Sequence, residues 1–297
     1  MRIMEADYST KMYVMTHKPF RHPGLEGFFP LQVGSALHEN LGYIRDDSGD
    51  NISDLNPYYS ELTGQYWLWK NEKQIKNIGC CHYRRYFINE KKDFLSIQEL
   101  ESLLGHTDIL AARLEDPRTW RELYGAGHNI KDLYTLGEVI KEKEPESYDV
   151  FERLLDSHTI CFGNMYAMSK AIFDEYMEWL FGLLTETGER IDFSSYDNYE
   201  KRVFGLLSEN MIQIFSLTRG YNMTSGRVSI IAEKSETTEL KLALKQLLKE
   251  NKFKEAQRLY DQYCSYRKDV LFSQSDISGE LAKLGNEIKR FVSEENS

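Results

Sequence analysis

Short apolar runs alternate along this chain with longer stretches in which apolar residues recur every three or four positions. The runs predict strands at Met12–Thr16, Leu41–Arg45, Ile75–Tyr83, Asp108–Ala112, Thr159–Met168 and Val228–Ala232. The longer stretches predict helices at Leu31–Leu37, Asn56–Asn71, Ser96–Leu104, Leu123–Leu155, Ala171–Leu184 and Tyr199–Leu217. Strands that alternate with helices in this way predict an α/β domain with a mixed sheet.

The pattern changes after about residue 233. Glycine becomes rare, and the spacing of Leu240, Leu244 and Phe253 predicts a helix hairpin, followed by a charged helix near residues 277–292. We therefore predict a large α/β domain, residues 1–235, and a helical extension, residues 236–297. One hairpin cannot bury its own apolar faces, so we expect it to contact the larger domain or to form a homo-oligomer with another subunit.

Composition narrows the class of protein. The 297 residues are 41% hydrophobic and 28% charged, as in an ordinary soluble protein, and the net charge of −10 argues against nucleic-acid binding. The four cysteines lack metal-ligand spacing and read as reduced, buried thiols. No run of about 18 apolar residues occurs, so we expect a cytoplasmic chain that neither is secreted nor spans a membrane. Peripheral contact with the inner face of the membrane remains open.

The stretch NIGCCHYRRYF begins as a buried strand and ends in charge. A continuous strand would place His82, Arg84 and Tyr86 on one face and Tyr83 and Arg85 on the other. Two guanidinium groups between tyrosine rings offer the donors and flat faces that a diphosphate and its attached sugar or base require. The competing interpretation is a surface strand end with salt-bridged arginines.

Acidic residues gather in the loop that follows the second predicted strand. Asp46 and Asp47 are adjacent and Asp50 lies three positions on, so they miss the Asp-x-Asp spacing that holds a metal–nucleotide pair. A solvated loop explains them equally well. The sequence thus predicts no metal site and no cofactor, although it is compatible with a divalent Mn or Mg ion.

Seven motifs occur together in an order that resembles a known bacterial family. They are THK at 16–18, LGYIRDDSGDNIS at 41–53, NPYYSELTGQYWLWKN at 56–71, GCCHYRRYF at 79–87, AGHN at 126–129 with an inserted glycine, GNMYAMSKAIFDEYMEWLF at 163–181 and DNYEKRVFGLLSE at 197–209. The family, long described as a domain of unknown function, is found in capsule, exopolysaccharide and O-antigen clusters. It is associated with galactofuranosyl transfer on a GT-A-like fold, and the resemblance runs from about residue 12 to 232.

The resemblance implies a glycosyltransferase that moves galactofuranose from UDP-galactofuranose to a hydroxyl of a growing, lipid-linked cell-surface glycan, with inversion. Two alternatives keep the fold. One is a noncatalytic glycan-binding or assembly protein, and the other is a transferase that uses another UDP-hexose. One hydroxyl contact can reverse sugar preference, so the sequence does not choose the donor.

The resemblance also implies where the donor binds. The arginines Arg84 and Arg85 stand where many GT-A enzymes carry Asp-x-Asp, and cations there replace carboxylates. Asn164 contacts the donor sugar or acceptor in this interpretation, although an Asn-Gly turn at a bulge explains it as well. The other expected donor-binding residues are Thr16, His17, Lys18, Asp47, Asp50, Asn51 and Tyr83.

An inverting displacement needs a general base for the acceptor proton. We predict Asp197, although a helix cap explains that residue equally well. Arg202 and Glu209, seven positions apart on one predicted helix face, are interpreted as supports. The alternative bases are Asp192, Glu209, His82 and His128.

Overall fold

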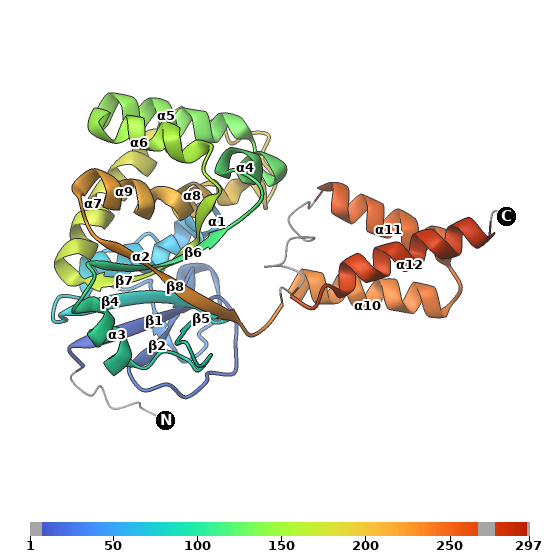
Figure 1. Ribbon diagram of the computed structural model, residues 1–297, viewed down its shortest axis with the longest axis horizontal. Helices are drawn as coiled ribbons and strands as arrows, with labels where there is room; N and C mark the ends of the chain where they lie inside the picture. The colour runs from blue at the N-terminus through green and yellow to red at the C-terminus, as the bar shows by residue number, and fades with distance from the viewer. Residues whose placement is uncertain (1–7, 234, 267–276, 296–297) are drawn as a thin grey trace. The chain divides into compact units, whose positions relative to one another are not determined.

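The chain forms two compact units, residues 1–229 and 230–297. The computed structural model describes residues 8–233, 235–266 and 277–295 (Figure 1). The first unit is a mixed α/β fold, as the alternation of strands and helices predicts, and the second unit is helical.

Eight strands form the sheet of the first unit, in the order β3-β2-β1-β4-β5-β8-β6-β7. Parallel pairs join β1 to β2, β1 to β4, β2 to β3 and β6 to β8, whereas β7 runs antiparallel to both β6 and β4. Because β7 returns to β4, the strands β4, β5, β8, β6 and β7 close into a small mixed barrel. The strands are β1 (Thr10–Thr16), β2 (Phe28–Gln32), β3 (Ile44–Arg45), β4 (Asn77–His82), β5 (Arg85–Ile88), β6 (Ile109–Glu115), β7 (Thr159–Ser169) and β8 (Met223–Ile230).

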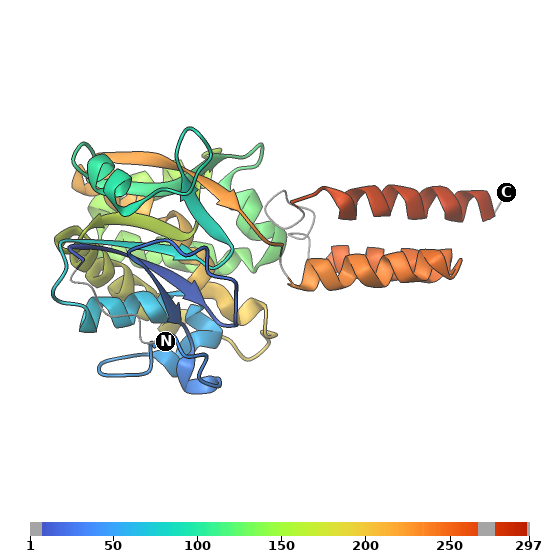
Figure 2. The ribbon, with the colours of Figure 1, turned by 90° about the horizontal axis from the view of Figure 1, so that it is seen from below.

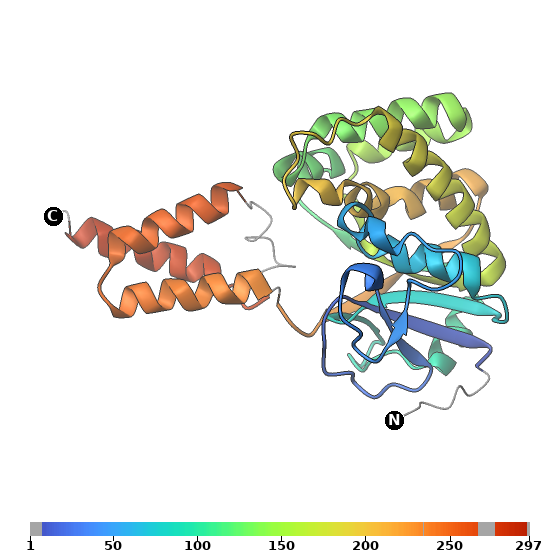
Figure 3. The ribbon, with the colours of Figure 1, turned by 180° about the vertical axis from the view of Figure 1, so that it is seen from behind.

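Helices cover the two faces of the sheet unequally. Figure 1 shows α5, α6, α7 and α9 on one side and α3 on the other, and Figure 3 shows α1 and α2 on the side of α7. The helices are α1 (Asn56–Tyr59), α2 (Leu62–Asn71), α3 (Ile97–Leu104), α4 (Trp120–Gly127), α5 (Ile130–Lys143), α6 (Pro145–Leu155), α7 (Lys170–Arg190), α8 (Val203–Leu207) and α9 (Met211–Arg219). Short 3-10 turns are η1 (Ser35–Leu37), η2 (Ser53–Leu55), η3 (Glu200–Arg202) and η4 (Ser208–Asn210).

The strand β1 separates two apolar cores. Tyr13 and Met15 pack into the larger core under the helix layer, and Met12 and Val14 pack into the smaller core with α3. This is the period of two that a strand buried on both faces requires. The adjacent thiols Cys80 and Cys81 divide between the same two cores, as their alternation predicts.

Several predicted elements differ from the structure. The stretch 28–32 is a strand, so the predicted helix at 31–37 is wrong; only the 3-10 turn η1 follows. The predicted helix 56–71 is broken at Ser60, which has φ 51°. The predicted helix 199–217 is divided into η3, α8, η4 and α9. The strand predicted at 228–232 starts too late, because β8 begins at Met223.

The helical unit contains its own apolar core. Its helices are α10 (Ser235–Lys249), α11 (Phe253–Tyr266) and α12 (Glu280–Glu295). Figure 1 shows the three side by side, and Figure 2 shows α10 and α12 along their lengths. Leu244 of α10, Ala256 of α11 and Leu284 of α12 belong to one buried cluster. Because α12 contributes to this cluster, the hairpin buries apolar side chains within its own unit. Its contact with the larger domain or with another subunit stays a prediction.

The packing of α2 on the sheet yields a stability prediction. A methyl group on Gly64 would stand 2.8 Å from both Met15 Sδ and Val33 Cγ1, whereas one on Gly182 of α7 would meet nothing within 4 Å. Both changes remove a helical glycine. We expect Gly182→Ala to raise the free energy of unfolding by about 0.5–1 kcal/mol. Gly64→Ala should lower it by roughly 1–2 kcal/mol through overpacking. Urea unfolding measures both, and equal gains would contradict the close packing.

Candidate functional site

The strand β4 ends in a tight turn. Tyr83 and Arg84 form this turn, and His82 of β4 pairs directly with Arg85 of β5. The prediction of one continuous strand with His82, Arg84 and Tyr86 on a shared face is therefore wrong. Directly paired residues of antiparallel strands project to the same side of the sheet, so His82 and Arg85 share a face.

The end of β1 lies beside this turn, because β1 and β4 are parallel neighbours and their carboxyl ends meet at one edge. Thr16 Oγ1 donates a hydrogen bond to the carbonyl of Lys18 at 2.6 Å. Three neighbours surround the ring of Tyr83. The centroid of the His17 ring lies 5.7 Å from the Tyr83 centroid, and Lys18 Nζ and Arg84 Cζ lie 5.5 Å and 5.4 Å from it. The structure thus brings together the residues predicted at the ends of these two strands.

The strand β7 contains a bulge that faces the same turn. Its register against β6 shifts at Ala112, where residues 162–165 of β7 leave the ladder. Gly163 and Asn164 have φ of 67° and 48°, in the left-handed region. A methyl group on Gly163 would stand 2.7 Å from Arg85 Nη1, so this position needs glycine for conformation and for space. The bulge that the sequence offered as one explanation of Asn164 is present, and its contact with a ligand stays a prediction.

Three side chains hold the bulge in place. Glu209 Oε1 accepts a hydrogen bond from the Gly163 N–H at 2.8 Å, and His82 Nε2 lies 2.5 Å from the Gly163 carbonyl oxygen. Asn164 Nδ2 donates to Glu61 Oε1 at 2.7 Å. We call the five polar side chains at this place the bulge cluster: Glu61, His82, Arg85, Asn164 and Glu209.

The imidazole of His82 is neutral. Burial lowers the pKa of His82 to about 4; the charge of Glu61 opposes this shift and that of Arg85 adds to it. A carbonyl oxygen only accepts, so the short contact to Gly163 fixes the proton on Nε2 and leaves Nδ1 as an acceptor. The separation of 3.9 Å between His82 Nε2 and Glu61 Oε1 is accordingly not an ion pair.

The two arginines carry buried donors that the described chain does not satisfy. Arg84 Nε and Nη1 and Arg85 Nε are buried and receive no partner within residues 8–233, 235–266 and 277–295. Neither guanidinium forms an ion pair there, which removes the salt-bridged interpretation for these residues. Burial lowers the pKa of Arg85, against the pull of Glu209, yet an arginine remains cationic at neutral pH. Unsatisfied guanidinium donors at one turn have the chemistry to bind an anion, so this turn is a candidate anion site.

The sequence analysis missed the carboxylate of Glu61. A continuous helix over 56–71 would have placed it in mid-helix, but the break at Ser60 makes it the first residue before α2. Gln65, one turn further, donates from Nε2 to the Asn164 carbonyl at 3.0 Å. No glycine or proline at position 60 signals the break, so only the motif SELTGQ as a whole pointed here.

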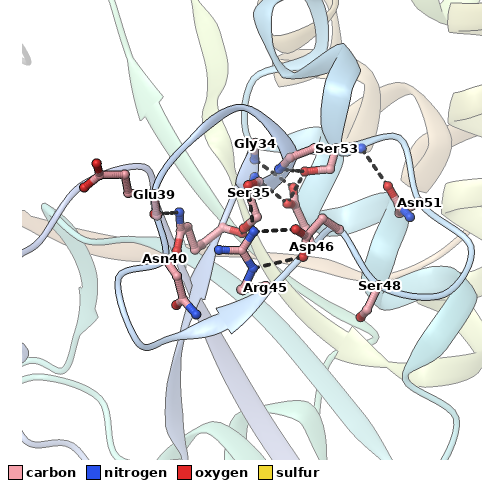
Figure 4. A network of polar contacts seen from close by, with 12 residues as sticks. Gly34, Ser35, Glu39, Asn40, Arg45, Asp46, Ser48, Asn51 and Ser53 are labelled. Atoms are coloured by element: carbon pink, nitrogen blue, oxygen red, sulfur yellow. Dashed lines mark hydrogen bonds and ion pairs between the residues drawn. The ribbon is translucent and has the colours of Figure 1, made fainter.

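The carboxylate of Asp46 organises the loop after β3, and it is buried rather than solvated. It accepts the backbone N–H of Gly34 and of Ser35, both at 2.9 Å, and the hydroxyls of Ser53 at 2.5 Å and Thr63 at 2.7 Å. Figure 4 shows Gly34, Ser35 and Ser53 gathered around it. Its neighbours hold it as a structural group, and the solvated-loop interpretation is wrong for this residue.

The other predicted residues of this loop bind nearby groups. Asp47 forms an ion pair with Arg45, and Asp50 Oδ1 accepts from the Tyr66 hydroxyl at 3.1 Å. Asn51 Oδ1 accepts a backbone N–H two residues on, at 3.2 Å. None of these contacts reaches the bulge cluster within the described residues, so the role of the three residues in donor binding stays a prediction.

The predicted base and its nearest alternative both serve turns. Asp197 Oδ1 accepts from the backbone N–H of Tyr199 at 2.6 Å and of Glu200 at 2.9 Å, so the capping role is present. Asp192 is exposed, and its Oδ1 accepts from the Ser194 N–H at 2.9 Å. A capping carboxylate is still able to accept a proton, and the catalytic role of Asp197 stays a prediction.

The predicted supports lie near the bulge, although not by the expected geometry. Arg202 lies in η3 and Glu209 in η4, with α8 between them, so the two residues do not stand on one continuous helix. Arg202 Nε donates to Ser60 Oγ at 3.1 Å, next to Glu61 of the bulge cluster. His128 lies at the end of α4, where its ring stacks on the Tyr199 ring with 4.8 Å between the centroids.

Residues 8–233, 235–266 and 277–295 contain neither a group of metal-ligating side chains nor a membrane-spanning helix. No three His, Cys, Asp or Glu side chains are placed together as metal ligands. None of the helices in these ranges has the length and apolar character needed to cross a membrane.

The fold and the site define a mixed α/β protein with a candidate anion site at the carboxyl edge of its parallel strands. Residues 11–220 match the model of DUF4422, a domain of unknown function, and the chain belongs to this family. A comparison with curated proteins gives no match. Among solved structures, the chain is similar to WbbM, described as a bifunctional glycosyltransferase, in its apo structure. The two are 27% identical with a TM-score of 0.69, over 75% of this chain and 45% of that chain.

The contrast between two adjacent aspartates yields a prediction. We expect Asp46→Asn to lower the free energy of unfolding by roughly 2–4 kcal/mol, because an amide reverses or weakens hydrogen bonds to a buried carboxylate. Asp47→Asn, which loses a partly exposed pair with Arg45, should cost about 1 kcal/mol or less. Urea unfolding of the two variants measures the difference, and similar losses would show that Asp46 does not organise the loop.

Proposed function

We propose that this protein is a glycosyltransferase that moves galactofuranose from UDP-galactofuranose to a hydroxyl of a growing bacterial cell-surface polysaccharide. Similarity to WbbM supports the class of reaction. This chain spans 45% of that chain, so we take from WbbM only glycosyl transfer. The galactofuranose donor and the capsule, exopolysaccharide or O-antigen acceptor follow from the family resemblance of the motifs.

The observation that carries the proposal is the set of unsatisfied guanidinium donors at the β4–β5 turn. Arg84 and Arg85 present buried Nε and Nη1 donors with no partner in the described chain. A diphosphate supplies the oxygens that such donors require, and two cations offset the charge that develops on it as it leaves. The aromatic and cationic groups around Tyr83 lie on the adjacent side, where a base stacks well.

The strand arrangement supports a GT-A-like assignment of the first unit. The parallel strands β2, β1 and β4 end at one edge, where α/β proteins bind ligands. In this proposal Thr16, His17 and Lys18 border the uridine and the bulge cluster faces the sugar. The acceptor is lipid-linked, so the reaction takes place at the inner face of the membrane.

The reaction is an inverting displacement at the anomeric carbon. The acceptor oxygen forms a bond to that carbon while the bond to the β-phosphate oxygen breaks, and UDP leaves with the electron pair. A base takes the acceptor proton, and Asp197 is the residue we propose for it. The arginines stabilise the leaving diphosphate in the role that a metal ion has in many GT-A enzymes.

Direct binding and product analysis test the function. Titration of UDP-galactofuranose by calorimetry should give saturable binding, and mass spectrometry of the product should show one added hexose on a suitable acceptor. A screen of other UDP-hexoses, UDP-galactopyranose first, separates the donors. No binding at millimolar UDP-galactofuranose would favour a noncatalytic glycan-binding or assembly protein.

The arginines should control turnover. We expect Arg84→Ala or Arg85→Ala to lower kcat by roughly 100-fold or more, because a preorganised partner of the transition-state charge is lost. Arg227→Ala is the matched control, since this arginine of β8 is exposed. Activity should survive EDTA. Complete loss of activity in EDTA, with recovery on addition of manganese, would contradict a metal-free mechanism. Asp46, Asp47 and Asp50 would then be candidate metal ligands.

The capping contacts of Asp197 allow its two roles to be separated. Asparagine keeps the acceptor oxygen for the Tyr199 and Glu200 N–H groups and removes the basicity. We expect Asp197→Asn to melt near the parent temperature, bind UDP normally and lose transfer by about 100-fold or more. Asp192→Asn, at an exposed turn, is the control. If Asp197→Asn keeps transfer activity while Asp192→Asn or Glu209→Gln loses it, Asp197 is not the general base. The base is then the residue whose substitution abolishes transfer.

A further inference from the structure

The carboxylate of Glu61 is mostly buried and has few partners. Its side chain is 11% exposed, and within the described residues it accepts one hydrogen bond, from Asn164 Nδ2 at 2.7 Å. A buried carboxylate has room for about four acceptor contacts and is costly to desolvate without them. Oε2 of Glu61 therefore has capacity for a donor that the described chain does not supply.

The backbone on both sides of this contact is held in unusual conformations. Ser60, directly before Glu61, has φ 51°, and Asn164 has φ 48°. Asn56 Nδ2 donates to the Ser60 carbonyl at 2.7 Å, and Gln65 Nε2 donates to the Asn164 carbonyl at 3.0 Å. Strained residues persist only where surrounding contacts fix them, and they concentrate at ligand sites. The Glu61–Asn164 pair is thus a preorganised contact.

The neighbouring acceptors have the same chemical character. His82 Nδ1 and Asn164 Oδ1, like Glu61 Oε2, accept no hydrogen bond from the described residues. The ligand group that matches a set of acceptors is a hydroxyl-bearing one, because each hydroxyl donates one proton. The donors of Arg85 stand beside them, since its Nη1 would lie 2.7 Å from a methyl group on Gly163. A polyol joined to a phosphate matches both halves of the cluster.

We propose that Glu61 binds a hydroxyl group of the donor sugar, with Asn164 holding its carboxylate in position. This inference rests on the proposed function and adds to it a sugar-binding residue. Glu61 then distinguishes UDP-sugar from UDP alone, whereas Arg84 and Arg85 bind the diphosphate that both ligands share.

The test compares two ligands in one variant. Calorimetry with UDP and with UDP-galactofuranose should show that Glu61→Gln weakens the UDP-sugar by about 10- to 100-fold and changes UDP by less than about twofold, as expected for loss of a charged hydrogen-bond acceptor. Asp54→Asn, an exposed carboxylate of η2, is the control and should change neither affinity. Asn164→Gly keeps the left-handed backbone and removes the orienting amide, so it should reproduce the selective loss if Glu61→Gln folds poorly.

The other outcomes overturn the inference in distinguishable ways. Unchanged affinities for both ligands, or equal weakening of both, would show that Glu61 does not contact the sugar. Unchanged binding with abolished transfer would make Glu61 a catalytic base instead. If the parent protein binds UDP and binds no UDP-hexose more tightly than UDP, the inference of a sugar-binding residue is wrong, although the diphosphate site stands. A parent protein that binds neither ligand at millimolar concentration would overturn the proposed function itself.

Discussion

The pairing of β7 with two partners is the constraint on which the site depends. β7 must stay antiparallel to β4 through Met168 and Tyr166 and also to β6 through Cys161, although it has more residues than β6 between these points. The surplus leaves the sheet as the bulge at Gly163 and Asn164. The contact of His82 with the Gly163 carbonyl oxygen places this bulge against the end of β4, beside the β4–β5 turn. The double pairing of β7 thus leaves its extra residues where the bulge cluster forms.

Charge balance follows from this geometry. Two guanidinium groups at one turn would repel each other in an apolar wall, and burial lowers the pKa of Arg85. The nearby carboxylates Glu209 and Glu61 offset that cost without binding the buried Nε of Arg85. His82 stays neutral and adds no third charge. The site therefore keeps cations that are available to an anion while the protein remains acidic overall.

Local periodicity predicted the elements whose conformation is set by burial. The apolar run from Met12 to Met15 identified β1, and the apolar spacing of 171–184 identified the centre of α7. Elements set by contacts between distant residues were missed. The turn at Tyr83 and Arg84 has no glycine or asparagine, so β5 was not foreseen.

The same distinction applies to the candidate site. The arginines and His82 were found from their unusual residue types at a strand end and Asn164 from the family resemblance. His82, Arg85 and Asn164 all belong to the bulge cluster. Glu61 was missed because its position depends on a break at Ser60 that local sequence does not signal. Asp46 looked like a loop residue because its partners, Gly34 and Thr63 among them, lie far from it in the chain.

The close approach of Gly163 to Arg85 ties these two positions together in evolution. Any side chain at 163 must displace the guanidinium as well as adopt a left-handed backbone, so the first mutation at either position changes what the other tolerates. Among related sequences, a residue larger than glycine at 163 should therefore accompany loss of arginine at 85. The two positions, 78 residues apart in the sequence (163 − 85), should covary as a unit.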